Sequence, residues 1–173
     1  MNDTMRQDAI SRVGITIAID GPAGSGKSTV SKALAARLGI GYLDTGAMYR
    51  ALTWYCLDRG IDLADIAAVA AAAHEMPLRL VSDPSDPHVW VGEREITQEI
   101  REPRIALEIK HVSTNLDVRA WMAEEQRRRM MEAREEGSGM IAEGRDITTV
   151  VCPDADVRIL LLADQEARLR RRT

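Results

Sequence analysis

The stretch Gly21-Pro22-Ala23-Gly24-Ser25-Gly26-Lys27-Ser28 decides the fold of this chain. It has the spacing G-x-x-x-x-G-K-[ST]. Glycines in this pattern let backbone N–H groups approach phosphate oxygens closely, the lysine reaches the β- and γ-phosphates, and the final hydroxyl binds Mg²⁺. The sequence therefore predicts a phosphate-binding loop, with Lys27 on the phosphates and Ser28 on the metal.

The residues on either side of this loop support the prediction. Residues 13–20 form a short, mostly apolar run that is typical of a buried parallel strand. Residues 26–38 predict a helix, in which Val30, Leu34 and Leu38 lie four apart on one face. A flexible glycine turn is the alternative interpretation of the loop. The order strand, loop, helix favours phosphate binding, because the helix N-terminus adds its positive dipole end.

Composition indicates an ordinary globular protein. The chain has 173 residues, 45% of them hydrophobic and 29% charged, and this length suits one α/β domain with a small insertion. Its net charge of −4 does not favour binding to nucleic acid polymers. The two cysteines have no metal-binding or redox spacing, which predicts reduced thiols in a cytoplasmic protein. Neither a secretory signal nor an apolar run long enough to span a bilayer is visible, so we expect no membrane partner.

The hydrophobic pattern changes character in the middle of the chain. Residues 40–43 predict a second core strand, and the helix after it begins at Asp44 or Thr45 and runs to about residue 59. The alanine-rich residues 64–74 predict another helix. Three short alternating stretches then predict antiparallel strands: 78–81, 88–91 and 94–96. We interpret residues 63–103 as an inserted subdomain within an α/β pattern.

The remaining residues return to the core pattern. A long helix or helix pair is expected from Pro103 to about Glu136, followed by core strands at 140–142 and 157–163. The predicted fold class is α/β: a P-loop core with a parallel sheet flanked by helices, plus a small inserted antiparallel β/α subdomain. The predicted parts are a flexible tail (1–12), the core (13–62 and 104–164), the insertion (63–103) and the start of a final helix (165–173).

Polar residues follow three of the predicted core strands, where open α/β sheets bind ligands. Besides the loop, they are 44–50 and 143–146. Arg50 and Arg145 could bind an acceptor phosphate with their planar guanidinium groups. Glu143 could hold a Mg²⁺-bound water. Each also has a purely structural interpretation, as a solvent-facing arginine or an ordinary carboxylate at the end of a strand.

Three stretches together resemble the bacterial cytidylate kinase family. They are Ile17 to Ser28, Leu43-Asp44-Thr45-Gly46-Ala47-Met48-Tyr49-Arg50, and Glu143-Gly144-Arg145-Asp146-Ile147 with the residues up to Ala155. The resemblance implies transfer of the ATP γ-phosphate to CMP or dCMP with Mg²⁺. It also implies that the core is a P-loop kinase core, that residues 63–103 are a nucleotide-binding insertion and that residues 165–173 start a mobile lid. We also expect a monomer that binds no nucleic acid.

The resemblance also implies roles for individual residues. Lys27, Arg145 and Asp146 would be catalytic, and Ser28, with Glu143 through a water, would hold the metal. The ATP-binding residues would be Gly21, Pro22, Ala23, Gly24, Ser25, Gly26, Lys27, Ser28, Thr29 and Arg168. The CMP-binding residues would be Thr45, Tyr49, Arg50, Arg119, Arg145 and Asp146.

This sequence departs from the family pattern in three places. Thr148 stands where the family usually has glycine, which predicts a different local turn. Lys110 falls where the family often has a serine that contacts the sugar, so the preference between ribose and deoxyribose stays open. Family members continue beyond Thr173, and we expect the chain to be a fragment whose last strand forms an open sheet edge.

Two other functions are compatible with the motifs. One is a non-catalytic fragment that binds ATP, and the other is a kinase for another small acceptor such as UMP. A GTPase switch is disfavoured, because the sequence has no Asn-Lys-x-Asp segment to bind guanine.

Overall fold

The computed structural model describes residues 14–164, and these divide into two compact units. The first unit contains the residues up to Asp44, Ser82–Ser85 and the residues from Gln126 onward. The second contains Thr45–Val81 and Asp86–Glu125. The predicted tail (1–12) and the predicted start of the lid (165–173) lie outside the described residues.

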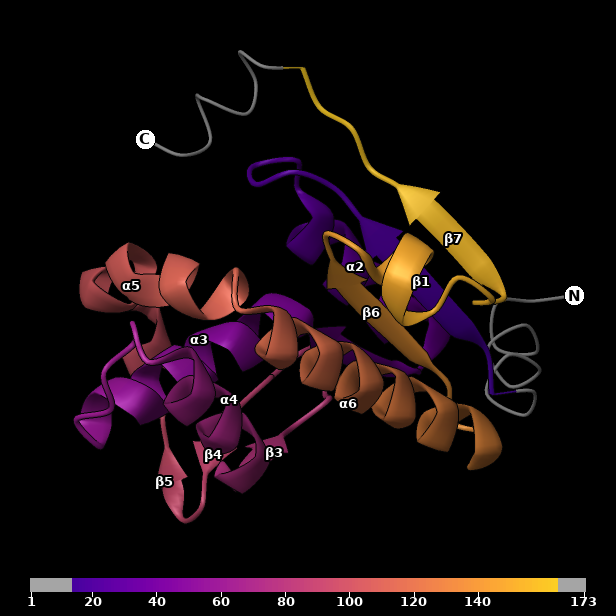
Figure 1. The fold of residues 1–173 in the computed structure, drawn as a ribbon. Coiled ribbons are helices and arrows are strands. Elements are labelled where there is room, and N and C mark those ends of the chain that lie inside the picture. Colours follow the sequence, from indigo (N-terminus) through magenta and orange to yellow (C-terminus); the bar gives the residue numbers. More distant parts are fainter. Residues whose placement is uncertain (1–13, 165–173) are drawn as a thin grey trace, which may run out of the picture. The chain divides into compact units, whose positions relative to one another are not determined.

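The first unit is built on a parallel sheet of four strands (Figure 1). They are β1 (Thr16–Asp20), β2 (Gly41–Asp44), β6 (Met140–Gly144) and β7 (Val157–Leu160). Their order is β2-β6-β1-β7, and every neighbouring pair is parallel. This confirms the predicted α/β class. The last strand is shorter than predicted, because its pairing with β1 ends at Leu160.

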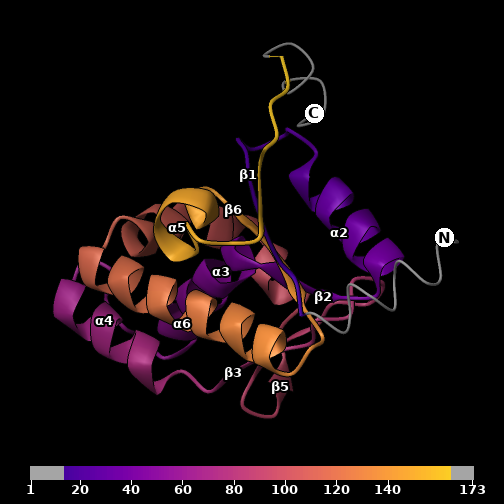
Figure 2. The same ribbon diagram turned by 90° about the vertical axis from the view of Figure 1, so that its right-hand side faces the viewer.

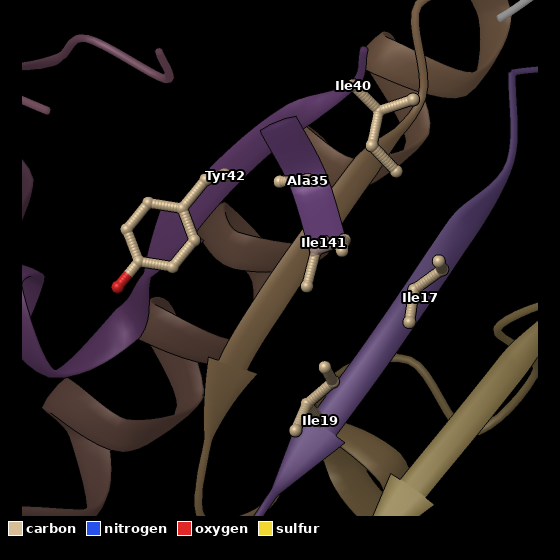
Figure 3. Packing of buried hydrophobic residues seen from close by; sticks show 6 residues of the cluster. All are labelled: Ile17, Ile19, Ala35, Ile40, Tyr42 and Ile141. Carbon is tan, nitrogen blue, oxygen red and sulfur yellow. The ribbon is translucent and has the colours of Figure 1, made fainter. Parts of the chain in front are cut away.

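Helix α2 (Lys27–Leu38) packs against β1, β2 and β6 on one face of this sheet (Figure 2). The core between them contains a cluster of buried side chains (Figure 3): Ile17, Ile19, Ala35, Ile40, Tyr42 and Ile141. Leu34 and Leu38 pack against this cluster, but Val30 is 42% exposed. The fully buried positions of the helix are the small residues Ser31 and Ala35, which allow close approach to the sheet.

The second unit combines helices with an antiparallel sheet of three strands. Its helices are α3 (Thr45–Asp58), α4 (Ile66–Glu75), the 3₁₀ turn η1 (Glu99–Arg101) and α5 (Pro103–Ser113). Helix α3 packs against the other three and against β4 of the sheet, which is formed by β3 (Leu78–Leu80), β4 (Val89–Val91) and β5 (Arg94–Glu95). Gly92, with φ of 59°, makes the predicted turn between β4 and β5.

The predicted helix pair after residue 103 consists of α5 and α6 (Leu116–Glu135). Helix α6 starts in the second unit and continues into the first at Gln126. Within residues 14–164, no helix combines the length and apolar character needed to cross a bilayer.

Candidate active site

The phosphate-binding loop connects β1 to α2, as its sequence predicts. Gly24 and Gly26 have φ of 78° and 87°, which side chains with a Cβ rarely adopt, and the N–H of Ser25 donates to the carbonyl of Pro22 at 3.2 Å. Gly21 is needed for a different reason. A Cβ there would lie 2.5 Å from the carbonyl oxygen of Leu161 and 2.8 Å from Ser25 Oγ.

A cavity of about 260 Å³, open to solvent, lies between the loop and the start of α2. It is lined by Gly24, Gly26, Lys27, Ser28 and Thr29. The first backbone N–H groups of a helix have no partner within the helix, and together with the helix dipole they favour an anion. The cavity therefore has the chemistry of a phosphate site.

A buried carboxylate lies beside this cavity. Glu143, in β6, is 2% exposed, and its Oε1 accepts a hydrogen bond from Ser28 Oγ at 2.6 Å. The same oxygen accepts from the Tyr42 hydroxyl at 2.7 Å. Tyr42 comes from β2, next to β6 in the sheet, so three separate segments of the chain meet at one carboxylate oxygen.

Burial governs the ionisation of this group. It raises the pKa of Glu143, and the negative charge of Asp44 raises it further. The hydrogen bonds from Ser28 and Tyr42 and the positive charge of Lys27 act in the opposite direction. Burial also raises the pKa of the Tyr42 phenol, with Asp44 and Glu143 adding to the effect, so Tyr42 stays protonated and donates.

The oxygen atoms of Ser28 and Glu143 fit a magnesium ion. Mg²⁺ binds oxygen ligands, keeps several waters and is commonly held by one or two protein groups together with substrate phosphates. The hydroxyl of Ser28 points its proton at Glu143. Its lone pairs can then face a cation, while the carboxylate can accept from a metal-bound water.

Arg145 and Asp146 directly follow Glu143 and Gly144, at the carboxyl end of β6. They form the link between β6 and a single π-helical turn, η2 (Ile147–Val151), and Arg145 is exposed. Thr148 lies in this turn, where its hydroxyl donates to Asp20 Oδ2 at 2.6 Å. All five predicted residues Lys27, Ser28, Glu143, Arg145 and Asp146 thus belong to the first unit.

The other predicted nucleotide-binding residues belong to the second unit. Thr45, Tyr49 and Arg50 lie in the first two turns of α3. Arg119 lies on α6, where it is exposed and donates to the carbonyl of Ser113 at 3.3 Å. Arg168, predicted to bind ATP, lies outside the described residues.

A scan against protein families matches the cytidylate kinase model to residues 17–173, nearly all of the chain. This chain belongs to the cytidylate kinase family. Curated cytidylate kinases of Streptomyces avermitilis and Streptomyces coelicolor are 44% and 45% identical to it, with 92% of this chain and 68% of each relative aligned. The cytidylate kinase of Rhodococcus opacus is 44% identical, with 94% of this chain and 69% of the relative aligned.

Two residues at the edge of this cytidylate kinase sheet were not predicted as part of the site. The sequence predicts Tyr42 only as part of a short strand, and Asp20 only as the last residue before the loop. The sequence does indicate that both residues are unusual, because each is polar and lies within or at the end of a predicted buried strand. A hydroxyl or a carboxylate within a buried strand needs a hydrogen-bond partner, although the sequence does not name that partner.

Proposed function

We propose that this chain transfers the γ-phosphate of ATP to CMP or dCMP and releases ADP and CDP or dCDP. The observation that carries the proposal is the arrangement of Lys27, Ser28 and the buried Glu143 around the phosphate-binding loop. Membership of the cytidylate kinase family supports the choice of acceptor.

The donor end of the reaction belongs to residues 21–29. Their backbone N–H groups and the dipole of α2 would bind the ATP phosphates, and Lys27 would stabilise the charge that develops on the transferred group. Phosphoryl transfer needs little covalent chemistry from a protein, so positioning and positive charge are the main contributions expected of this loop.

We further propose that Mg²⁺ binds with ATP, held by Ser28 and, through a water, by Glu143. When bound, the ion would neutralise charge on the β- and γ-phosphates. Ser28 would orient its lone pairs by donating to Glu143, and Tyr42 would hold that carboxylate in place.

The acceptor end would be formed by the residues that resemble the family motifs: Thr45, Tyr49, Arg50, Arg119, Arg145 and Asp146. The arginines would bind the CMP phosphate, and Asp146 would accept a hydrogen bond from the nucleotide. An oxygen of the CMP phosphate would attack the γ-phosphorus as the bond to ADP breaks. In this proposal residues 13–62 and 104–164 form the core, residues 63–103 the nucleotide-binding insertion, and residues 165–173 with Arg168 the start of a lid.

The test is a coupled ADP-release assay with ATP, Mg²⁺ and CMP, dCMP, UMP or AMP. We expect kcat/KM for CMP and dCMP to exceed the value for UMP. Equal values for CMP and UMP would remove the cytidine assignment. ATP binding by calorimetry without turnover of any acceptor would instead support an ATP-binding module.

We also propose that the chain acts as a monomer in the cytoplasm. Light scattering of the purified protein would check the first part, since a mass twice the 19.1 kDa of one chain would contradict it.

A further inference from the structure

Asp20 occupies an unusual place for a carboxylate. It is the last residue of β1, it directly precedes Gly21 of the phosphate-binding loop, and it is only 3% exposed. Its side chain accepts three hydrogen bonds, all from the beginning of η2. Ile147 N donates to Oδ1 at 2.9 Å, and Thr148 donates to Oδ2 from its N at 2.8 Å and its Oγ1 at 2.6 Å.

These bonds replace a conventional helix cap. The N–H groups at the start of a helical turn have no partner within the turn, and a negative charge near them is favourable. Here the carboxylate comes from a different strand, 127 residues earlier in the sequence than Ile147. Since the donors are buried or half-buried, losing the acceptor would leave polar groups without compensation.

The backbone N–H of the next residue, Gly21, holds the other end of the same segment. Asp20 pairs with Gly144 in the register of β1 and β6, and the N–H of Gly21 donates to the carbonyl of Gly144 at 3.4 Å. Only Arg145 and Asp146 lie between Gly144 and Ile147. Two consecutive residues therefore fix both ends of this two-residue link: Gly21 through its backbone N–H and Asp20 through its carboxylate.

Asp20 is continuous with the phosphate-binding loop. Its own carbonyl accepts from Leu161 N at 2.8 Å, and a Cβ on Gly21 would collide with the Leu161 carbonyl, so the loop start is closely confined. A change in the position of Asp20 would be passed to the loop and to the Arg145–Asp146 link together.

We propose that Asp20 and Thr148 are positioning residues, which set Arg145 and Asp146 relative to the phosphate-binding loop so that the acceptor nucleotide meets the donor phosphate. This inference rests on the proposed function, in which Arg145 and Asp146 bind CMP. The hydroxyl of Thr148 supplies one of the three bonds and can be removed without altering the backbone.

The test compares three variants at neighbouring positions, with Asp20→Asn as a fourth variant in the exchange measurement. Thr148→Val removes the hydroxyl and keeps the shape, Thr148→Ser restores it, and Thr149→Val is the matched control. Thr149 is exposed, and its hydroxyl donates to the Asp146 carbonyl of its own turn, at 3.5 Å. Steady-state kinetics are measured with CMP and with ATP varied separately, and amide hydrogen exchange is followed at Ile147 and Thr148.

We expect Thr148→Val to raise the KM for CMP about tenfold, which is the effect of roughly 1.4 kcal/mol, while the KM for ATP changes less than about twofold. Thr148→Ser should return the KM for CMP to near the wild-type value, and Thr149→Val should leave it unchanged. Exchange at the two amides should quicken in Thr148→Val and more so in Asp20→Asn, in which an NH₂ donor replaces one of the two acceptor oxygens.

Two results would overturn the inference. One is faster amide exchange in Thr148→Val with an unchanged KM for CMP, because the bond would then serve stability alone. The other is an equal loss in Thr148→Ser and Thr148→Val. A wild-type chain that binds ATP but does not use CMP would instead overturn the proposed function, and the role of Asp20 in acceptor positioning would fall with it.

Discussion

The hydroxyl of Tyr42 donates a 2.7 Å hydrogen bond to Glu143, a carboxylate that is 2% exposed. The Tyr42 ring packs in the hydrophobic cluster beside α2. Its hydroxyl lies at the end of the ring that points away from β2 (Figure 3). Lys32 Nζ lies 5.6 Å from the ring centroid. One side chain thus joins the core of the sheet to the group proposed to support Mg²⁺.

Replacing Tyr42 by Phe keeps the ring and removes this donor. We expect the free energy of unfolding to fall by about 1–3 kcal/mol, because the buried carboxylate loses a hydrogen bond without gaining water. Urea denaturation measures this loss. Tyr55→Phe is the control, since it removes the hydroxyl of another buried tyrosine, on α3. Equal stability of Tyr42→Phe and the wild type would show that the bond contributes nothing.

Replacing Lys27 by Ala tests the donor end of the site. We expect kcat to fall at least about 10²-fold, because one preorganised charge on the transition state is typically worth ~3 kcal/mol or more. Single-turnover measurements with saturating ATP would separate this effect from weaker binding. Arg37→Ala removes a positive charge from the last turn of the same helix and should leave kcat near the wild-type value. Near-normal turnover in Lys27→Ala would contradict the proposed role.

Replacing Arg145 by Ala should affect the acceptor and spare the donor. Loss of a charge-assisted bond to the CMP phosphate is expected to raise the KM for CMP by about tenfold or more, while ATP affinity measured by calorimetry changes little. Arg158→Ala is the control, since Arg158 is an exposed arginine on β7 of the same unit. A parallel loss of ATP affinity would place Arg145 at the donor site instead.

Replacing Gly21 by Ala should disrupt the loop. The new Cβ would lie 2.5 Å from the Leu161 carbonyl oxygen, a backbone atom that cannot move away alone. We expect a destabilisation of about 1–3 kcal/mol, the usual range for overpacking, together with weaker ATP binding. Gly41→Ala is the comparison, because its nearest neighbours would be at ordinary contact distances of 3.4 and 3.5 Å. Similar thermal stability of the two variants would refute the steric argument.

The second unit contains a pH-dependent contact. His88 lies between two carboxylates, with Nδ1 2.6 Å from Glu95 and Nε2 3.0 Å from Asp86. Hydrogen bonds to Asp86 and then Glu95 raise the pKa of His88, and the hydrogen bond with His88 lowers the pKa of Glu95. The histidine contribution is therefore complete below its unfolded pKa and disappears as pH rises through its folded pKa. The glutamate contribution is complete above its unfolded pKa and disappears as pH falls.

Replacing His88 by Gln should therefore lower the free energy of unfolding most at pH values between the unfolded pKa of Glu95 and that of His88. We expect the stability difference between wild type and His88→Gln to be largest near about pH 5.5 and to shrink toward pH 9, when the wild-type imidazole loses its charge. Chemical denaturation at a series of pH values measures this difference. His111→Gln is the control, since His111 Nε2 is 3.8 Å from the carboxylate of Glu108 and more exposed. A difference that does not vary with pH would exclude the ion pair as its cause.

Local sequence patterns determined the elements on which the site is built. The spacing of residues 21–28 alone predicted the loop and the roles of Lys27 and Ser28, since close backbone approach demands glycine there. The apolar run before the loop predicted a buried strand. These features depend on residues a few positions apart, and the structure confirms the strand, the loop and the helix.

Contacts between distant segments were decided only by the tertiary structure. Tyr42 and Glu143 are 101 positions apart, and Asp20 and Thr148 are 128 apart. Each pair meets because the strand order is β2-β6-β1-β7. This order places β6 between β2, which carries Tyr42, and β1, which carries Asp20. A periodic pattern shows which residues are buried, but it does not show which strand lies next to which. The partners of a buried carboxylate are therefore set by sheet order, which arises from packing of the whole unit.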